Sequence, residues 1–137
     1  MDNPIVRAVL AGIAGIVVAG IVVALVESAG HMIYPPPPDL DLERPEDLAR
    51  LLEVIPLGAK ISVVVAWFLG ALAGASVAGW IGRSKKPGWA VAVFMLIASV
   101  VTTLMIPHPV WMIVAAAVLP FAGKLLADRL FASRITA

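Results

Sequence analysis

The sequence predicts an all-α membrane protein: an antiparallel bundle of four transmembrane helices, with a short amphipathic helix in the first outer loop. The chain has 137 residues, of which 61% are hydrophobic and only 14% are charged. A soluble globular domain is about 45–50% apolar and about 25% charged. Four apolar segments also approach the roughly 20 residues that a membrane helix needs. We therefore expect a single transmembrane domain, residues 1–137, in contact with the lipid bilayer.

The first predicted span covers residues 5–33. Asn3 can cap this helix, and Pro4 suits its first turn, where a missing N–H costs nothing. The helix must end before Pro35, because the residue that precedes a proline disfavours helical conformation. A cleaved signal peptide is the alternative, with small residues at Ser28-Ala29-Gly30. The charge-free run is long for a signal peptide and favours a retained span.

The first outer loop, residues 35–56, is proline-rich and acidic. It begins with four consecutive prolines, which form a stiff extended strut. A short amphipathic helix is predicted at about residues 45–55, because apolar residues there share one helical face. These residues are Leu48, Leu51, Leu52 and Ile55. We expect this helix to cover the outer end of the bundle, and docking of a partner protein is the alternative.

Three further spans are predicted at residues 57–82, 87–106 and 109–131. The last two are separated only by Pro107-His108-Pro109, which makes a tight hairpin. Pro120 lies inside the fourth span and is expected to kink it, because proline cannot donate the helical hydrogen bond.

The second span carries small residues at strict four-residue spacing, which lets helix backbones approach closely in a membrane. The row consists of Ala66, Gly70, Gly74, Ala78 and Gly82. We expect Gly70, Gly74 and Ala78 to pack against the first span, which is also rich in small residues. A homodimer through the same surface is the alternative.

Basic residues predict the orientation. Seven of the ten lysines and arginines fall on one side of the four-span arrangement, where only two acidic residues oppose them. These seven are Arg7, Arg83, Lys85, Lys86, Lys124, Arg129 and Arg134. Because basic loops stay inside, both termini are expected in the cytoplasm of a bacterial cell. The proline-rich loop and His108 then lie outside the cytoplasmic membrane.

Glu27 and His31 form the most informative polar pair, since they lie one helical turn apart near the end of the first span. Ionisable groups inside membrane spans are costly and often functional. Lys60 and His108 are expected at a similar depth, near the outer side of the membrane. Together with Glu27 and His31 they form a candidate cluster of four polar residues. Gly20, Ala24 and Glu27 share a face of the helix, and we expect that face to meet another helix.

Two interpretations of this cluster stay open. In the first, Glu27 bonds His31, Lys60 or backbone N–H groups and ties the outer helix ends together. In the second, Glu27 binds protons or cations and His31 relays protons. Glu27, His31 and His108 are too few ligands for a convincing metal site, and we expect no metal.

Several function classes have no support in the sequence. There are no cysteines, so thiol catalysis and thiolate metal sites are excluded. No nucleophile–histidine–acid motif, phosphate-binding loop or haem attachment motif occurs. No basic cluster is long enough to indicate nucleic-acid binding. We therefore expect no enzymatic activity, no cofactor and no nucleic-acid partner.

Two motifs resemble those of a family of small bacterial four-span membrane proteins. They are Glu27-Ser28-Ala29-Gly30-His31 followed by Tyr34-Pro35-Pro36-Pro37, and Met105-Ile106-Pro107-His108-Pro109-Val110-Trp111. The resemblance implies where these residues lie in the four-span layout, and it implies no particular activity. The chain is also similar in size and span number to small multidrug-resistance transporters, which carry a glutamate in their first span. It departs from them because its glutamate lies near the end of the span and its first loop is long and acidic.

These observations favour a non-enzymatic structural or accessory component of the membrane, with a membrane-protein partner or a second copy as its binding partner. The alternative is a small proton-coupled transporter or channel that uses Glu27, working as a dimer.

Overall fold

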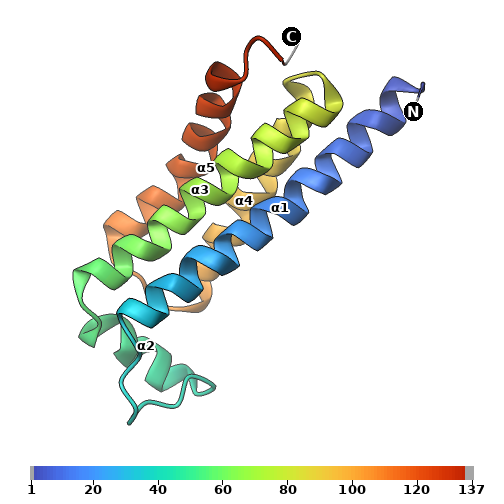
Figure 1. Ribbon diagram of the computed structural model, residues 1–137. Helices are drawn as coiled ribbons and strands as arrows, with labels where there is room; N and C mark the ends of the chain where they lie inside the picture. The colour runs from blue at the N-terminus through green and yellow to red at the C-terminus, as the bar shows by residue number, and fades with distance from the viewer. Residues whose placement is uncertain (1, 135–137) are drawn as a thin grey trace.

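Four long helices and one short helix make up the computed structural model, which describes residues 2–134 (Figure 1). The helices are α1 (Pro4–Ile33), α2 (Pro45–Val54), α3 (Leu57–Gly82), α4 (Lys86–Met105) and α5 (Val110–Leu130). All except α2 are long and apolar enough to cross a membrane. The predicted fold class is confirmed, and the chain is a multi-pass membrane protein. Residue 1 and residues 135–137 of the predicted domain lie outside the described part.

The helix ends follow from local sequence. The Asn3 side chain accepts hydrogen bonds from the backbone N–H groups of Ile5, at 2.9 Å, and Val6, at 3.4 Å. Both groups belong to the first turn of α1, which has no helical acceptors for them. At the end of α3, Arg83 adopts a left-handed conformation with φ of 51°. This conformation ends the helix and turns the chain into α4 within three residues.

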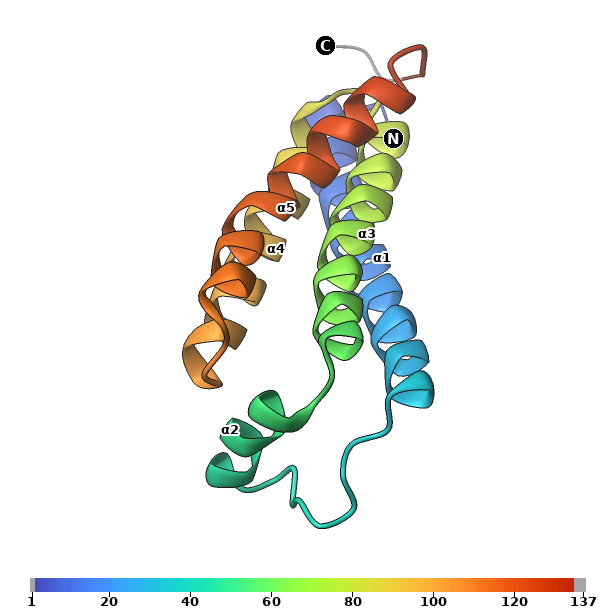
Figure 2. The ribbon, with the colours of Figure 1, turned by 90° about the vertical axis from the view of Figure 1, so that its left-hand side faces the viewer.

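Helix α3 is the centre of the bundle. It packs against α1, α4 and α5, and α4 also packs against α1 and α5 (Figures 1 and 2). Both described chain ends lie beside the α3–α4 turn, at an end that we call the basic end. Helix α2 and the α4–α5 connection lie at the opposite end, which we call the loop end.

The bundle interior is built from small residues, and the large apolar side chains face outward. Nine of the thirteen buried hydrophobic residues are alanines. Large residues such as Ile13, Val17 and Ile21 are more than half exposed. A soluble bundle would show the reverse distribution, whereas lipid-facing helices need small residues at their contacts and apolar ones outside.

Pro120 is buried inside α5, and the helix curves along its length (Figure 2). Proline has no N–H to donate to the carbonyl group of Ala116, four residues earlier. The Ser99 hydroxyl of α4 donates a hydrogen bond to that carbonyl oxygen at 3.0 Å. A neighbouring helix thus satisfies the acceptor that the proline leaves open.

Candidate functional site

A cavity of about 210 Å³ lies at the loop end, and Glu27 and His31 line it. Its walls come from the end of α1, the proline-rich segment, α2 and the start of α3. The other lining residues are mostly apolar: Gly30, Tyr34, Pro36, Leu42, Leu51, Ile55, Ala59, Ser62 and Val63. The volume is sufficient for several water molecules.

Helical spacing places the polar pair on the cavity. Glu27, Gly30, His31 and Tyr34 recur at three- and four-residue intervals, so they share one face of α1. Gly30 is buried against the Ser62 side chain of α3, and a Cβ atom at Gly30 would lie 2.5 Å from the Ser62 hydroxyl oxygen. This close approach holds the end of α1 against the start of α3.

Glu27 is half-buried, and within residues 2–134 its carboxylate accepts no hydrogen bond. His31 is exposed, and its charge, when protonated, attracts the Glu27 carboxylate. The structure therefore does not show the fully bonded glutamate of the first interpretation. Instead it presents a carboxylate whose oxygen atoms are available to water or a ligand in the cavity.

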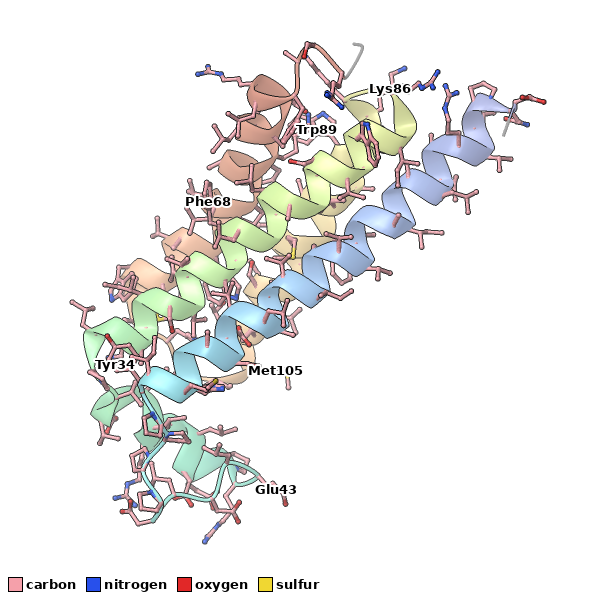
Figure 3. All side chains as sticks on the ribbon, in the orientation of Figure 1. Tyr34, Glu43, Phe68, Lys86, Trp89 and Met105 are labelled. Carbon is pink, nitrogen blue, oxygen red and sulfur yellow. The ribbon has the colours of Figure 1, made fainter. Side chains whose placement is uncertain are left out.

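Tyr34 closes the cavity toward α3. The Tyr34 ring lies directly against Gly58, where a Cβ atom would overlap the phenol oxygen and ring. Figure 3 shows Tyr34 where α1 ends, close to α2 and the start of α3, and shows Glu43 out on the loop. Only glycine leaves room for the ring at this position, because any side chain would occupy the same space.

Lys60 and His108 lie on a second cavity, of about 380 Å³, and not on the cavity that Glu27 lines. Ala49, Leu52 and Glu53 of α2 also line this second cavity. The four predicted polar residues are thus divided into two pairs. Helix α2 contributes to both cavities, with Leu51 on one and Leu52 on the other.

His108 is held by its own loop and by α3. Its Nδ1 lies 2.5 Å from the carbonyl oxygen of Ile106, so Nδ1–H is the donor. The imidazole also packs at a tilt against the buried Trp67, with the ring centroids 6.4 Å apart. These contacts explain the position of His108 without a ligand.

The expectation that Gly20 and Ala24 meet another helix is wrong. Both residues are exposed, and a Cβ atom added to Gly20 would have no neighbour within 4 Å. The helix contacts of α1 instead use Ala11, Gly15 and Ala19, which are fully covered. The rotation of α1 about its axis explains the difference. Ala11, Gly15 and Ala19 lie on the face of α1 that packs against α3, and Gly20 lies on another face.

Gly70, Gly74 and Ala78 lie within the α1–α3 contact. A Cβ atom at Gly74 would lie 2.5 Å from the Gly15 carbonyl oxygen, and one at Gly70 would lie 2.6 Å from Val23. Ala78 is fully buried and adjoins Gly15. This contact is intrachain, so it is not available for a second copy.

Sequence reasoning missed a buried ion pair at the basic end. The sequence places Lys124 among the seven basic residues of the cytoplasmic side, and its side chain is only 2% exposed. It pairs with Asp128, one turn along α5, and its ammonium lies 4.3 Å from the ring centroid of Trp89. The i, i+4 spacing of the two charges was a usable signal, but the covering by α4 was not visible in the sequence.

Among residues 2–134, no group of three or more histidine, cysteine, aspartate or glutamate side chains is arranged to hold a metal ion. Comparisons with models of protein families, with characterised proteins and with solved structures gave no match.

Proposed function

We propose that this chain is a non-enzymatic accessory component of the bacterial cytoplasmic membrane, and that its loop end contacts another membrane protein. The proposal is based on how little of α2 is buried against the rest of the protein. This helix has no buried residue and makes few contacts with the bundle. Its exposed apolar side chain is Val54, which is 58% exposed and next to Glu53, and Leu42, just ahead of the helix, is 44% exposed. The leucines of the helix, Leu48, Leu51 and Leu52, are half-buried.

The packing of the spans supports this assignment of roles. Gly15 and Ala19 of α1 pack directly against Gly70 and Gly74 of α3, so these small residues are not free to contact a second membrane protein. The α1–α3 contact below Glu27 is filled by backbone and alanine side chains around Gly15 and Gly74. A sealed contact of this kind favours an accessory role over transport along that helix pair.

A photo-crosslinking experiment in native membranes tests the proposal. A photoreactive residue replaces Glu43 on the loop, Val54 on α2, or Val118 on the exposed face of α5 as the control. We expect one defined protein adduct from positions 43 and 54 and none from position 118. Equal adducts at all three positions, or none at positions 43 and 54, would contradict the proposal.

The orientation is tested with cysteine labelling, since the natural chain has no cysteine background. Glu43→Cys and Lys85→Cys lie at opposite ends of the bundle. A membrane-impermeant maleimide applied to intact cells should label the position 43 variant. It should label the position 85 variant only after permeabilisation. The reverse pattern would overturn the assignment of cytoplasmic termini, which rests on the basic residues.

One observation favours a second candidate, a proton-coupled transporter that uses Glu27. Its carboxylate accepts no hydrogen bond in the described structure and faces a cavity with room for water. Proton flux into liposomes separates the two candidates. The accessory role predicts no flux above that of empty liposomes. Flux that Glu27→Gln abolishes, and that the matched Glu53→Gln variant of the other cavity preserves, would establish transport instead.

A further inference from the structure

A long groove of about 690 Å³ lies at the basic end, away from the cavities of the loop end. The N-terminal half of α1 forms one wall, and the α3–α4 turn and the start of α4 form the other. Lys86 marks this region in Figure 3, near the first turns of α1. The groove therefore runs from the helix ends, at the level of lipid headgroups, into the apolar part of the bundle.

The mouth of the groove is basic. Arg7, Arg83 and Lys86 line it, and among residues 2–134 no acidic residue does. The Nε atom of Arg7 is buried and has no hydrogen-bond partner. A buried donor without a partner is unfavourable, and an acceptor in the groove would satisfy it.

The rest of the groove is apolar. Val9, Ile13 and Ile16 of α1 and Ala90 of α4 line it below the charges. Pro4 and Ile16 lie twelve residues apart, or roughly 18 Å at about 1.5 Å per residue. The groove thus combines positive charge at headgroup level with an apolar wall long enough for much of an acyl chain.

We propose that this groove is a binding site for an anionic glycerophospholipid. The phosphate lies between Arg7 and Lys86, and one acyl chain lies along Val9, Ile13 and Ile16. Basic pockets between transmembrane helices on the cytoplasmic side are suited to anionic headgroups. A free phosphate would match the charges but would leave the apolar wall unused, and a zwitterionic lipid would match the wall but not the charges.

The test measures binding and thermal stability of the full chain in detergent, by native mass spectrometry and by melting temperature. The probes are phosphatidylglycerol, phosphatidylcholine and inorganic phosphate. We expect phosphatidylglycerol to stay bound and to raise the melting temperature more than the other two probes do. Equal effects of phosphatidylcholine, or a full effect of inorganic phosphate alone, would overturn the proposal.

Variants locate the site. Arg7→Gln and Lys86→Gln should each weaken phosphatidylglycerol binding about fivefold, from about 1 kcal/mol for each basic residue near the headgroup. Arg129→Gln is the matched control, because Arg129 is an exposed charge near the same end but does not line the groove. An equal loss in the control would mean that net charge, and not the groove, attracts the lipid.

A second kind of variant keeps the test independent of any folding defect at Arg7. Ile13→Trp enlarges a side chain that is already 54% exposed and fills the apolar wall without changing charge. We expect it to weaken phosphatidylglycerol binding while the melting temperature without lipid is kept. Unchanged binding in this variant would refute the placement of the acyl chain.

Discussion

The Ser99 hydroxyl donates to the Ala116 carbonyl oxygen, which is the acceptor that Pro120 leaves without its helical donor. Two helices are thus joined at the point where one of them is interrupted. The donor is 2% exposed, so water cannot replace it easily. In a membrane an unsatisfied backbone carbonyl is costly, which makes this pair a structural requirement of the α4–α5 hairpin.

Ser99→Ala should therefore destabilise the protein by about 0.6–2 kcal/mol, the range for interhelical hydrogen bonds in membranes. The measurement is unfolding in detergent, with Pro120→Ala and the double variant completing a cycle. In the Pro120→Ala background an N–H again reaches the Ala116 carbonyl, so Ser99→Ala should cost much less there. Additive effects of the two substitutions would show that they are not coupled.

Gly15→Ala should loosen the bundle. A Cβ atom at position 15 would lie 2.6 Å from the Gly74 carbonyl oxygen and 2.8 Å from the Cβ of Ala78. Helix α1 must move away to accommodate it, and overpacking of this kind costs about 1–3 kcal/mol. The melting temperature in detergent measures the effect.

Gly20→Ala is the matched control on the same helix. Its added Cβ atom has no neighbour within 4 Å, and alanine is the better helix former by about 1 kcal/mol. We expect an unchanged or higher melting temperature. Equal destabilisation by the two alanine variants would contradict the close packing of α1 on α3.

Asp128→Asn should destabilise the basic end by about 3–5 kcal/mol, because it leaves the buried Lys124 ammonium without its counter-charge. The double variant Lys124→Met/Asp128→Leu removes both charges and should recover most of the loss. Unfolding in detergent measures both, with the exposed Arg129→Gln as control. A double variant as unstable as Asp128→Asn would show that packing, and not the unpaired charge, caused the loss.

Gly58→Ala should open the cavity that Glu27 lines, because a side chain at position 58 displaces the Tyr34 ring. Ser62→Cys places a single reactive thiol on that cavity in a cysteine-free chain. We expect maleimide to label this thiol several-fold faster when Gly58→Ala is also present. The same rate with and without Gly58→Ala would mean that Tyr34 does not control access.

The helices of this protein could be predicted from sequence because their signals are local. Each span is a run of apolar residues bounded by proline, glycine or charge, and backbone groups in lipid must be satisfied within the helix. The split of the basic residues likewise predicted that the two termini and the α3–α4 turn share one end. The structure places both described chain ends beside that turn.

The candidate site was less predictable. Spacing along α1 correctly placed Glu27 and His31 on one face, and the structure puts both on one cavity. Lys60 and His108 were assigned to the same cluster from depth alone, yet they line a different cavity. Depth in the membrane follows from residue number, whereas the direction in which a side chain points follows from rotation of the whole helix.

The sequence by itself determined the four spans, the loop helix and the distribution of charge between the two ends. Only the tertiary structure decided that Gly20 faces outward, that Lys124 is buried, and that the four polar residues line two different cavities. The physical reason is that a helix fixes the angles between its own residues but not its rotation against its neighbours. That rotation is set by which small residues let two backbones meet, as at Gly15 and Gly74.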